Sequence, residues 1–109
     1  MNTEQAIKKY VPMTDTMFHI LLVLNDEMHG YAIAKKVQEI SNGRLELEAG
    51  TIYSSLAKLH RDALIVEHKS SDDRRRIYKI TDVGRTVLAS ECDRLMDVVS
   101  AVTKYMSVK

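Results

Sequence analysis

The sequence predicts a mainly helical protein with a small β-hairpin, built from one domain and a long C-terminal helix. Three observations support this fold class. Apolar residues recur every three or four positions in three short segments, at about 15–25, 30–41 and 50–62. The pattern changes to strand-like alternation at about 64–80. A heptad pattern of apolar residues then runs from 88 to 106.

The first two segments are expected to differ in how regular their structure is. Residues 1–13 predict a loose or weakly helical arm, because Pro12 disfavours a helix just before it. Thr14 or Asp15 can cap the next segment. Apolar residues at helical spacing then predict a first helix from Asp15 to about Asn25.

Two further helices follow. One is predicted over about 30–41 and ends at Asn42-Gly43, since glycine tolerates the left-handed conformation that closes helices. The other spans about 50–62. Its inward stripe consists of Ile52, Leu56 and Leu59.

A β-hairpin is predicted next. Residues 64–69 and 75–80 have strand character, and Ser70-Ser71-Asp72-Asp73 between them have the composition of a turn. Tyr78 is expected to be a core ring on the inner face of the second strand. Three helices followed by a two-stranded wing make a winged helix-turn-helix, which we assign to residues 14–80.

Residues 81–109 are expected to form a dimerisation helix, capped at Thr81-Asp82 and ending near Ser107. A helix of this length has little of its own domain to pack on, so a second copy of the chain would bury its seam. An intramolecular amphipathic helix is the alternative. The seam consists of Leu88, Cys92, Leu95, Val99, Val102 and Met106.

Composition restricts the class of protein. The chain is 45% hydrophobic and 28% charged, as expected of a soluble globular domain rather than a disordered one. The sequence has no apolar run of membrane-spanning length, and residues 1–10 lack the apolar core of a signal peptide. A single cysteine, Cys92, makes a reducing cytoplasm the expected location.

Positive charge is concentrated in one third of the chain. Residues 50–80 hold seven Lys and Arg against four Asp and Glu, although the net charge of the chain is only +1. The polar face of the third helix could enter a DNA major groove, and the basic wing could contact the backbone. An ordinary solvated surface is the alternative. The residues concerned are Thr51, Ser54, Ser55, Lys58, Arg61, Lys69, Arg74, Arg75 and Arg76.

Several motifs in this order resemble the PadR family of bacterial transcriptional regulators. The similarity covers about residues 14–88 and includes His29-Gly30-Tyr31, Gly50-Thr51-Ile52-Tyr53 and a segment from Arg74 to Thr81 that is followed by Gly84-Arg85. The resemblance implies a dimeric winged-helix regulator, in most cases a repressor and often one that responds to small molecules.

The resemblance also implies roles for individual residues. It places Thr51, Tyr53, Ser54 and Lys58 on the recognition helix and Arg74, Arg75 and Arg76 on the basic wing. Tyr31 matches the start of the second helix, where its hydroxyl could reach a phosphate. For Tyr31 and Tyr53, partial core packing with a hydrated hydroxyl is the alternative.

An effector site is a further hypothesis. Between two copies of the chain, it would be lined by Met17, Leu95, Met96 and Val99. Some relatives hold flat aromatic drugs between tryptophans, and this chain has no Trp. Apolar residues at helical spacing are otherwise ordinary core, which is the alternative for these four.

The motifs do not indicate an enzyme. The four histidines and Cys92 lack metal-ligand spacing, and the sequence has neither a phosphate-binding glycine run nor a nucleophile elbow. We therefore expect no cofactor, no metal and no membrane partner. The sequence predicts a homodimeric repressor that binds double-stranded DNA at a palindromic operator. The alternatives are a protein-interaction adaptor and a redox sensor that acts through Cys92.

Overall fold

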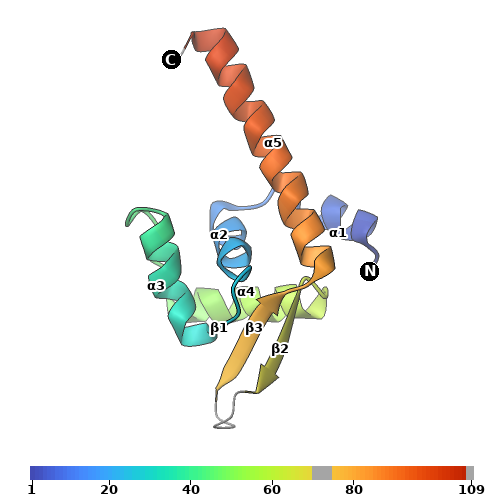
Figure 1. The fold of residues 1–109 in the computed structure, drawn as a ribbon, viewed down its shortest axis with the longest axis vertical. Coiled ribbons are helices and arrows are strands. Elements are labelled where there is room, and N and C mark those ends of the chain that lie inside the picture. The colour runs from blue at the N-terminus through green and yellow to red at the C-terminus, as the bar shows by residue number, and fades with distance from the viewer. Residues whose placement is uncertain (70–74, 108–109) are drawn as a thin grey trace.

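The computed structural model describes residues 1–69 and 75–107. It confirms a mainly helical winged helix-turn-helix with a long C-terminal helix, which projects away from the rest of the molecule (Figure 1). The described elements are α1 (Thr3–Tyr10), α2 (Asp15–Val23), β1 (Met28–His29), α3 (Gly30–Ile40), α4 (Ala49–Arg61), β2 (Ile65–Lys69), β3 (Arg76–Ile80) and α5 (Asp82–Met106).

The sequence predicts a loose or weakly helical arm, and the structure has a capped helix at Thr3–Tyr10 in its place. The side chain of Asn2 accepts a hydrogen bond from the backbone N–H of Gln5 at 2.8 Å, and Gln5 accepts one from the N–H of Asn2 at 2.9 Å. This reciprocal capping box satisfies two backbone donors that the helix itself leaves unpaired. Ala6 and Tyr10 are buried, so α1 is also held by packing, and it lies against α5.

Helix α2 begins at Asp15, as the sequence predicts. The hydroxyl of Thr14 accepts a hydrogen bond from the N–H of Met17 at 3.1 Å, which caps the helix. Helix α3 is followed by Asn42 and Gly43, which have φ values of 55° and 80°. This left-handed turn ends the helix where the sequence indicates.

Within residues 1–69 and 75–107, the sheet has three antiparallel strands in the order β1-β3-β2, one strand more than the predicted hairpin. On β3, Tyr78 pairs with Met28 of β1 on one side and with Glu67 of β2 on the other. Strand β1 is only two residues long, which is too short for an alternating pattern to be recognised. Tyr78 is buried, which confirms the core ring predicted at this position.

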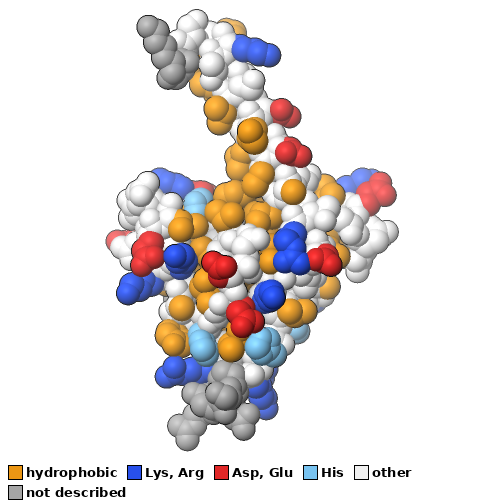
Figure 2. Space-filling view, in the orientation of Figure 1, with side chains coloured by type: hydrophobic (Ala, Val, Ile, Leu, Met, Phe, Trp, Pro, Cys, Tyr) orange, Lys and Arg blue, Asp and Glu red, His pale blue; other side chains and the backbone are white. Residues whose placement is uncertain are grey.

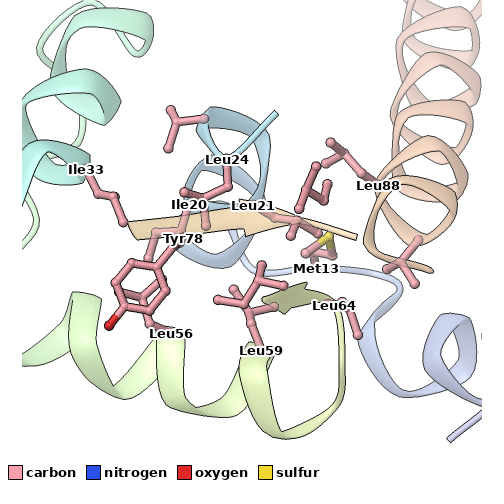
Figure 3. Packing of buried hydrophobic residues seen from close by; sticks show 14 of the residues in the cluster. Met13, Ile20, Leu21, Leu24, Ile33, Leu56, Leu59, Leu64, Tyr78 and Leu88 are labelled. Carbon is pink, nitrogen blue, oxygen red and sulfur yellow. The ribbon is translucent and has the colours of Figure 1, made fainter. Parts of the chain in front are cut away.

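The hydrophobic core lies where the helices meet the sheet (Figure 3). Helix α2 contributes a buried cluster, and α4 covers it from one side with Leu56 and Leu59. Tyr78 and Leu88 bring β3 and the first part of α5 into the same core. The buried residues of α2 are Ile20, Leu21 and Val23, with Leu24 directly after it.

The first turn of α5 lies directly on the chain between α4 and β2. The N–H of Thr81 donates to the carbonyl oxygen of Leu64 at 3.0 Å, and its hydroxyl donates to the carbonyl of Ala63 at 2.7 Å. A Cβ atom added to Gly84 would lie 2.1 Å from the carbonyl oxygen of Leu64. Only glycine therefore allows α5 to approach this backbone so closely.

After this contact α5 packs against α1 and the core as far as Leu95, and its side chains are exposed from Met96 onward as far as the structure describes them. At 1.5 Å per residue, its 25 residues span about 38 Å. In the described part of the chain, no helix combines the length and the apolar character needed to cross a membrane.

Replacing Gly84 with Ala should lower the free energy of unfolding by about 1–3 kcal/mol, because the backbone of Leu64 cannot yield as a flexible side chain would. Thermal or urea unfolding measures the effect. Gly50→Ala is the matched control, because a Cβ atom at Gly50 would have no neighbour within 4 Å. A Gly84→Ala variant as stable as the wild type would contradict this account of the α5 junction.

Candidate nucleic-acid interface

The outer face of α4 is the surface on which the predicted DNA contacts depend. Its inward stripe of Ile52, Leu56 and Leu59 is buried, as expected. The opposite side is built from small and polar residues, and the hydroxyl of Ser54 donates to the carbonyl of Thr51 at 3.1 Å. The exposed residues of this face are Gly50, Thr51, Tyr53, Ser54, Ala57, His60 and Arg61.

Two residues that the sequence assigned to this face lie elsewhere. Ser55 is only 9% exposed, so it is unavailable to DNA in this conformation. It follows Ile52 by three positions and precedes Leu59 by four, which places it among the inward residues. Lys58 is half-buried, and its Nζ lies 5.3 Å from the centroid of the Tyr10 ring. Its side chain is therefore directed toward α1.

The start of α3 packs against the side of α4. A Cβ atom at Gly30 would lie 3.0 Å from the ring and from the hydroxyl of Tyr53. The absence of a side chain at position 30 thus lets the half-exposed Tyr53 lie close to the first turn of α3. His29 precedes this turn, and its side chain makes no capping hydrogen bond. The start of α3 therefore lacks a side-chain cap, and the partial positive charge at this end of a helix favours an anion nearby.

The wing contacts the same helix start through an arginine. The guanidinium of Arg75 lies 5.0 Å from the centroid of the Tyr31 ring, and its Nη1 donates to the Tyr31 hydroxyl at 3.3 Å. Tyr31 is 63% exposed, so it is a surface ring rather than a core ring. The ring of His29 also neighbours it, with 5.3 Å between the ring centroids. The arrangement stacks a cation on an aromatic ring at the surface.

The other basic residues of the wing differ in their surroundings. Arg76 lies 3.7 Å from Glu67 on the neighbouring strand, which partly balances its charge. Lys69 is exposed at the end of β2. Arg74 lies outside the described residues. The structure therefore places Arg75, Arg76 and Lys69 on the wing, with Arg75 directed toward α3.

A cleft of about 370 Å³ joins these parts. It brings together four of the predicted contact residues, Tyr31 of α3, Tyr53 of α4, Arg76 of β3 and Arg75 directly before β3. The cleft is rich in groups that donate hydrogen bonds to oxyanions. Its other lining residues are His29, Gly30 and Tyr78.

Tyr78 closes the inner side of this cleft. Burial raises the pKa of its phenol, and the nearby carboxylate of Glu67 raises the pKa further. Tyr78 therefore stays protonated at neutral pH.

The sequence predicted no role for His29 or His60. A signal was present for both, because His29 lies in the His-Gly-Tyr motif and His60 follows Tyr53 by two helical turns.

The residues of the predicted dimer seam differ in how exposed they are. Leu88 is buried in the chain's own core, whereas Cys92 and Leu95 are half-buried. Val99 is 64% exposed, and Val102 and Met106 are exposed as well. Figure 2 shows apolar side chains along the projecting part of α5. The open part of the seam therefore begins after Leu88.

The hypothesised effector residues are not all brought together within one chain. Leu95, Met96 and Val99 line a shallow apolar hollow of about 310 Å³ with Ser100. Met17 lines a different hollow, beside Tyr10 and Lys58. Among residues 1–69 and 75–107, no three His, Cys, Asp or Glu side chains are grouped so that they could hold a metal ion.

Comparisons with known proteins agree with this geometry. A family model described as the transcriptional regulator PadR-like family matches residues 20–90. The transcriptional regulator Rv3488 of Mycobacterium tuberculosis is 36% identical over 69 residues, which amount to 62% of this chain and 62% of that protein. The match thus spans less than two thirds of that relative's length.

Solved structures show the same fold. A transcriptional regulator from Clostridium thermocellum has a TM-score of 0.73 at 23% identity, with 96% of this chain and 98% of that chain covered. PadR of Bacillus subtilis, solved in complex with operator DNA, has a TM-score of 0.64 at 25% identity, with 72% and 47% covered. Because the family model matches more than half of the chain, including all of α3, α4 and the sheet, the chain belongs to the transcriptional regulator PadR-like family.

Proposed function

We propose that this protein is a homodimeric repressor that binds a palindromic operator in double-stranded DNA. The observation that carries the proposal is the continuous surface formed by the outer face of α4, the first turn of α3 and the cleft beside Arg75. Support also comes from the similarity to PadR of Bacillus subtilis, which has been solved with operator DNA.

The outer face of α4 suits close approach to base edges. Gly50, Ser54 and Ala57 are exposed and small, so the helix backbone could enter a major groove deeply. The hydroxyls of Thr51 and Ser54 could then contact bases or phosphates, and Arg61 could contact the backbone further along the helix. We assign sequence reading to this face of α4.

The cleft between α3, α4 and the wing suits a phosphate of the DNA backbone. Arg75 supplies positive charge, and Tyr31 and Tyr53 supply hydroxyl donors at the same cleft. The start of α3 adds the favourable end of a helix dipole. Lys69 and Arg74 of the wing would contact neighbouring phosphates. These contacts position the protein on DNA, and they carry little sequence information.

The exposed apolar side of α5 supports the dimer. Met96 is 70% exposed and Val99 64% exposed, on a helix that extends beyond its own domain. Apolar surface in contact with water is unfavourable by about 25 cal/mol per Å², so pairing of two α5 helices would be stabilising. Two-fold symmetry would also place two copies of α4 on successive turns of DNA, where the dimer could block transcription.

We further propose that the hollow formed by Leu95, Met96 and Val99 takes an apolar effector at the dimer interface. Its lining is almost entirely apolar, and it lies on the same side of α5 as the proposed contact between chains. An occupant there would alter how the two α5 helices pack. The angle between the two DNA-binding units would change with that packing.

Replacing Arg75 with Ala should weaken binding to every DNA sequence several-fold and reduce the slope of log affinity against log salt by about one, because one phosphate contact is lost. Fluorescence anisotropy at several salt concentrations measures both effects. Arg85→Ala is the matched control, since Arg85 pairs with Asp82 in the first turn of α5. If the affinity of the wild-type protein for DNA did not depend on salt concentration, a protein-interaction adaptor would be favoured instead.

Replacing Val99 with Asp should convert the dimer to monomers, because a carboxylate would be buried in the paired apolar seam. Light scattering coupled to gel filtration measures the molar mass. Ala101→Asp adds the same charge two residues along the helix, on the side away from Val99, and should remain dimeric. A dimeric Val99→Asp variant would mean that the interface lies elsewhere.

A further inference from the structure

A buried polar network joins α1 to the C-terminal end of α4. Asp62 is the C-cap residue of α4 and is only 7% exposed. The hydroxyl of Tyr10 donates to Oδ2 of Asp62 at 2.7 Å, and Nζ of Lys9 lies 2.8 Å from the same oxygen. The amine of Lys58, one turn earlier on α4, lies over the ring of Tyr10. Two consecutive residues of α1 thus hold the end of one helix.

The charges in this network are maintained at neutral pH. Burial raises the pKa of Asp62, but hydrogen bonds from Lys9 and Tyr10 outweigh this effect, so its pKa lies below the usual value. Burial and the bond to Asp62 raise the pKa of Tyr10, which therefore remains a phenol. Removing either partner would leave a buried carboxylate with less compensation, which is costly.

The chain that follows α1 is held by α5. Glu91 of α5 is 1% exposed and accepts two hydrogen bonds from Arg94, at 2.8 and 2.7 Å. The nearby backbone of Met13 also helps to keep the pKa of Glu91 low. Met13 itself is buried in the core, and α1 packs against α5. Residues 9–13 therefore connect α5 with the end of α4, where Lys9 and Tyr10 supply directional polar contacts.

We propose that Lys9 and Tyr10 are positioning residues for the DNA-reading helix. They fix the direction of α4 relative to α5, and this inference rests on the proposed function. The remaining contacts of α4 are mostly apolar, and apolar burial has little directional preference. Charge-assisted hydrogen bonds at the helix end supply that direction. In a two-fold dimer, any rotation of α4 against α5 would act on both half-sites at once.

The first test measures affinity against the spacing of the operator half-sites. The spacer between the two half-sites of an operator that wild type binds is lengthened and shortened by single base pairs, and binding is measured for wild type, Lys9→Gln and Tyr10→Phe. Wild type should prefer one spacing sharply. The variants should bind that spacing about tenfold less tightly, the factor expected for one charge-assisted bond, and should discriminate less between spacings. Tyr10→Phe keeps the buried ring, so the core stays filled.

Lys8→Gln is the matched control, since it removes the same charge from the neighbouring, exposed position on α1. It should keep the wild-type profile. If Lys9 and Tyr10 only stabilised the fold, affinity would fall by the same factor at every spacing. A profile of unchanged shape in both variants would therefore overturn the inference.

The second test does not require DNA. Spin labels are attached through Ala57→Cys on α4 and Asp97→Cys on α5, both exposed sites, in a Cys92→Ser background. Labelled chains are diluted into unlabelled ones, so that only distances within one chain are measured. Lys9→Gln and Tyr10→Phe should broaden or shift the distance distribution, and Lys8→Gln should not.

The two tests separate the inference from the proposed function. Distances in both variants as narrow as in wild type would overturn the positioning role, whatever the DNA result. Broadened distances together with a wild type that binds no operator would support the positioning role and refute the proposed function.

Discussion

The contact between the first turn of α5 and the backbone of Leu64 determines how the molecule is assembled. Gly84 leaves no side chain between the two segments, and Thr81 bonds to the carbonyls of Ala63 and Leu64. Thr81 lies between β3 and α5, whereas Ala63 and Leu64 lie between α4 and β2. Because these two segments meet at one junction, the orientation of the long helix and the position of the wing are set together.

Apolar burial alone would not define these orientations. The core that α2, α4 and β3 share excludes water but allows helices to rotate with little loss of contact. Two buried carboxylates supply the directional contacts that the apolar core lacks. Asp62 bonds α4 to α1, and Glu91 of α5 lies near Met13 in the segment that follows α1. Each is paired with a cation, Lys9 or Arg94, so burial of the charge is compensated.

Periodicity in the sequence was sufficient for the larger elements and insufficient for local exceptions. The α2, α3, α4 and α5 helices were predicted within about two residues, because each repeats its apolar spacing over several turns. Strand β1 is too short to repeat any pattern. Ser55 was misplaced because a hydroxyl does not show whether it faces water or core. The cleft could not be predicted from the sequence, because the close approach of Gly30 to Tyr53 joins residues of two different helices.

The stacking of Arg75 on Tyr31 has a consequence for the entropy of binding. A free arginine side chain has about 2 kcal/mol of rotamer entropy, part of which is lost when the side chain binds a phosphate. Here the aromatic ring and its hydroxyl already confine the guanidinium in the free protein. Under the proposed function, much of that ordering thus occurs during folding, and the wing would meet DNA preorganised.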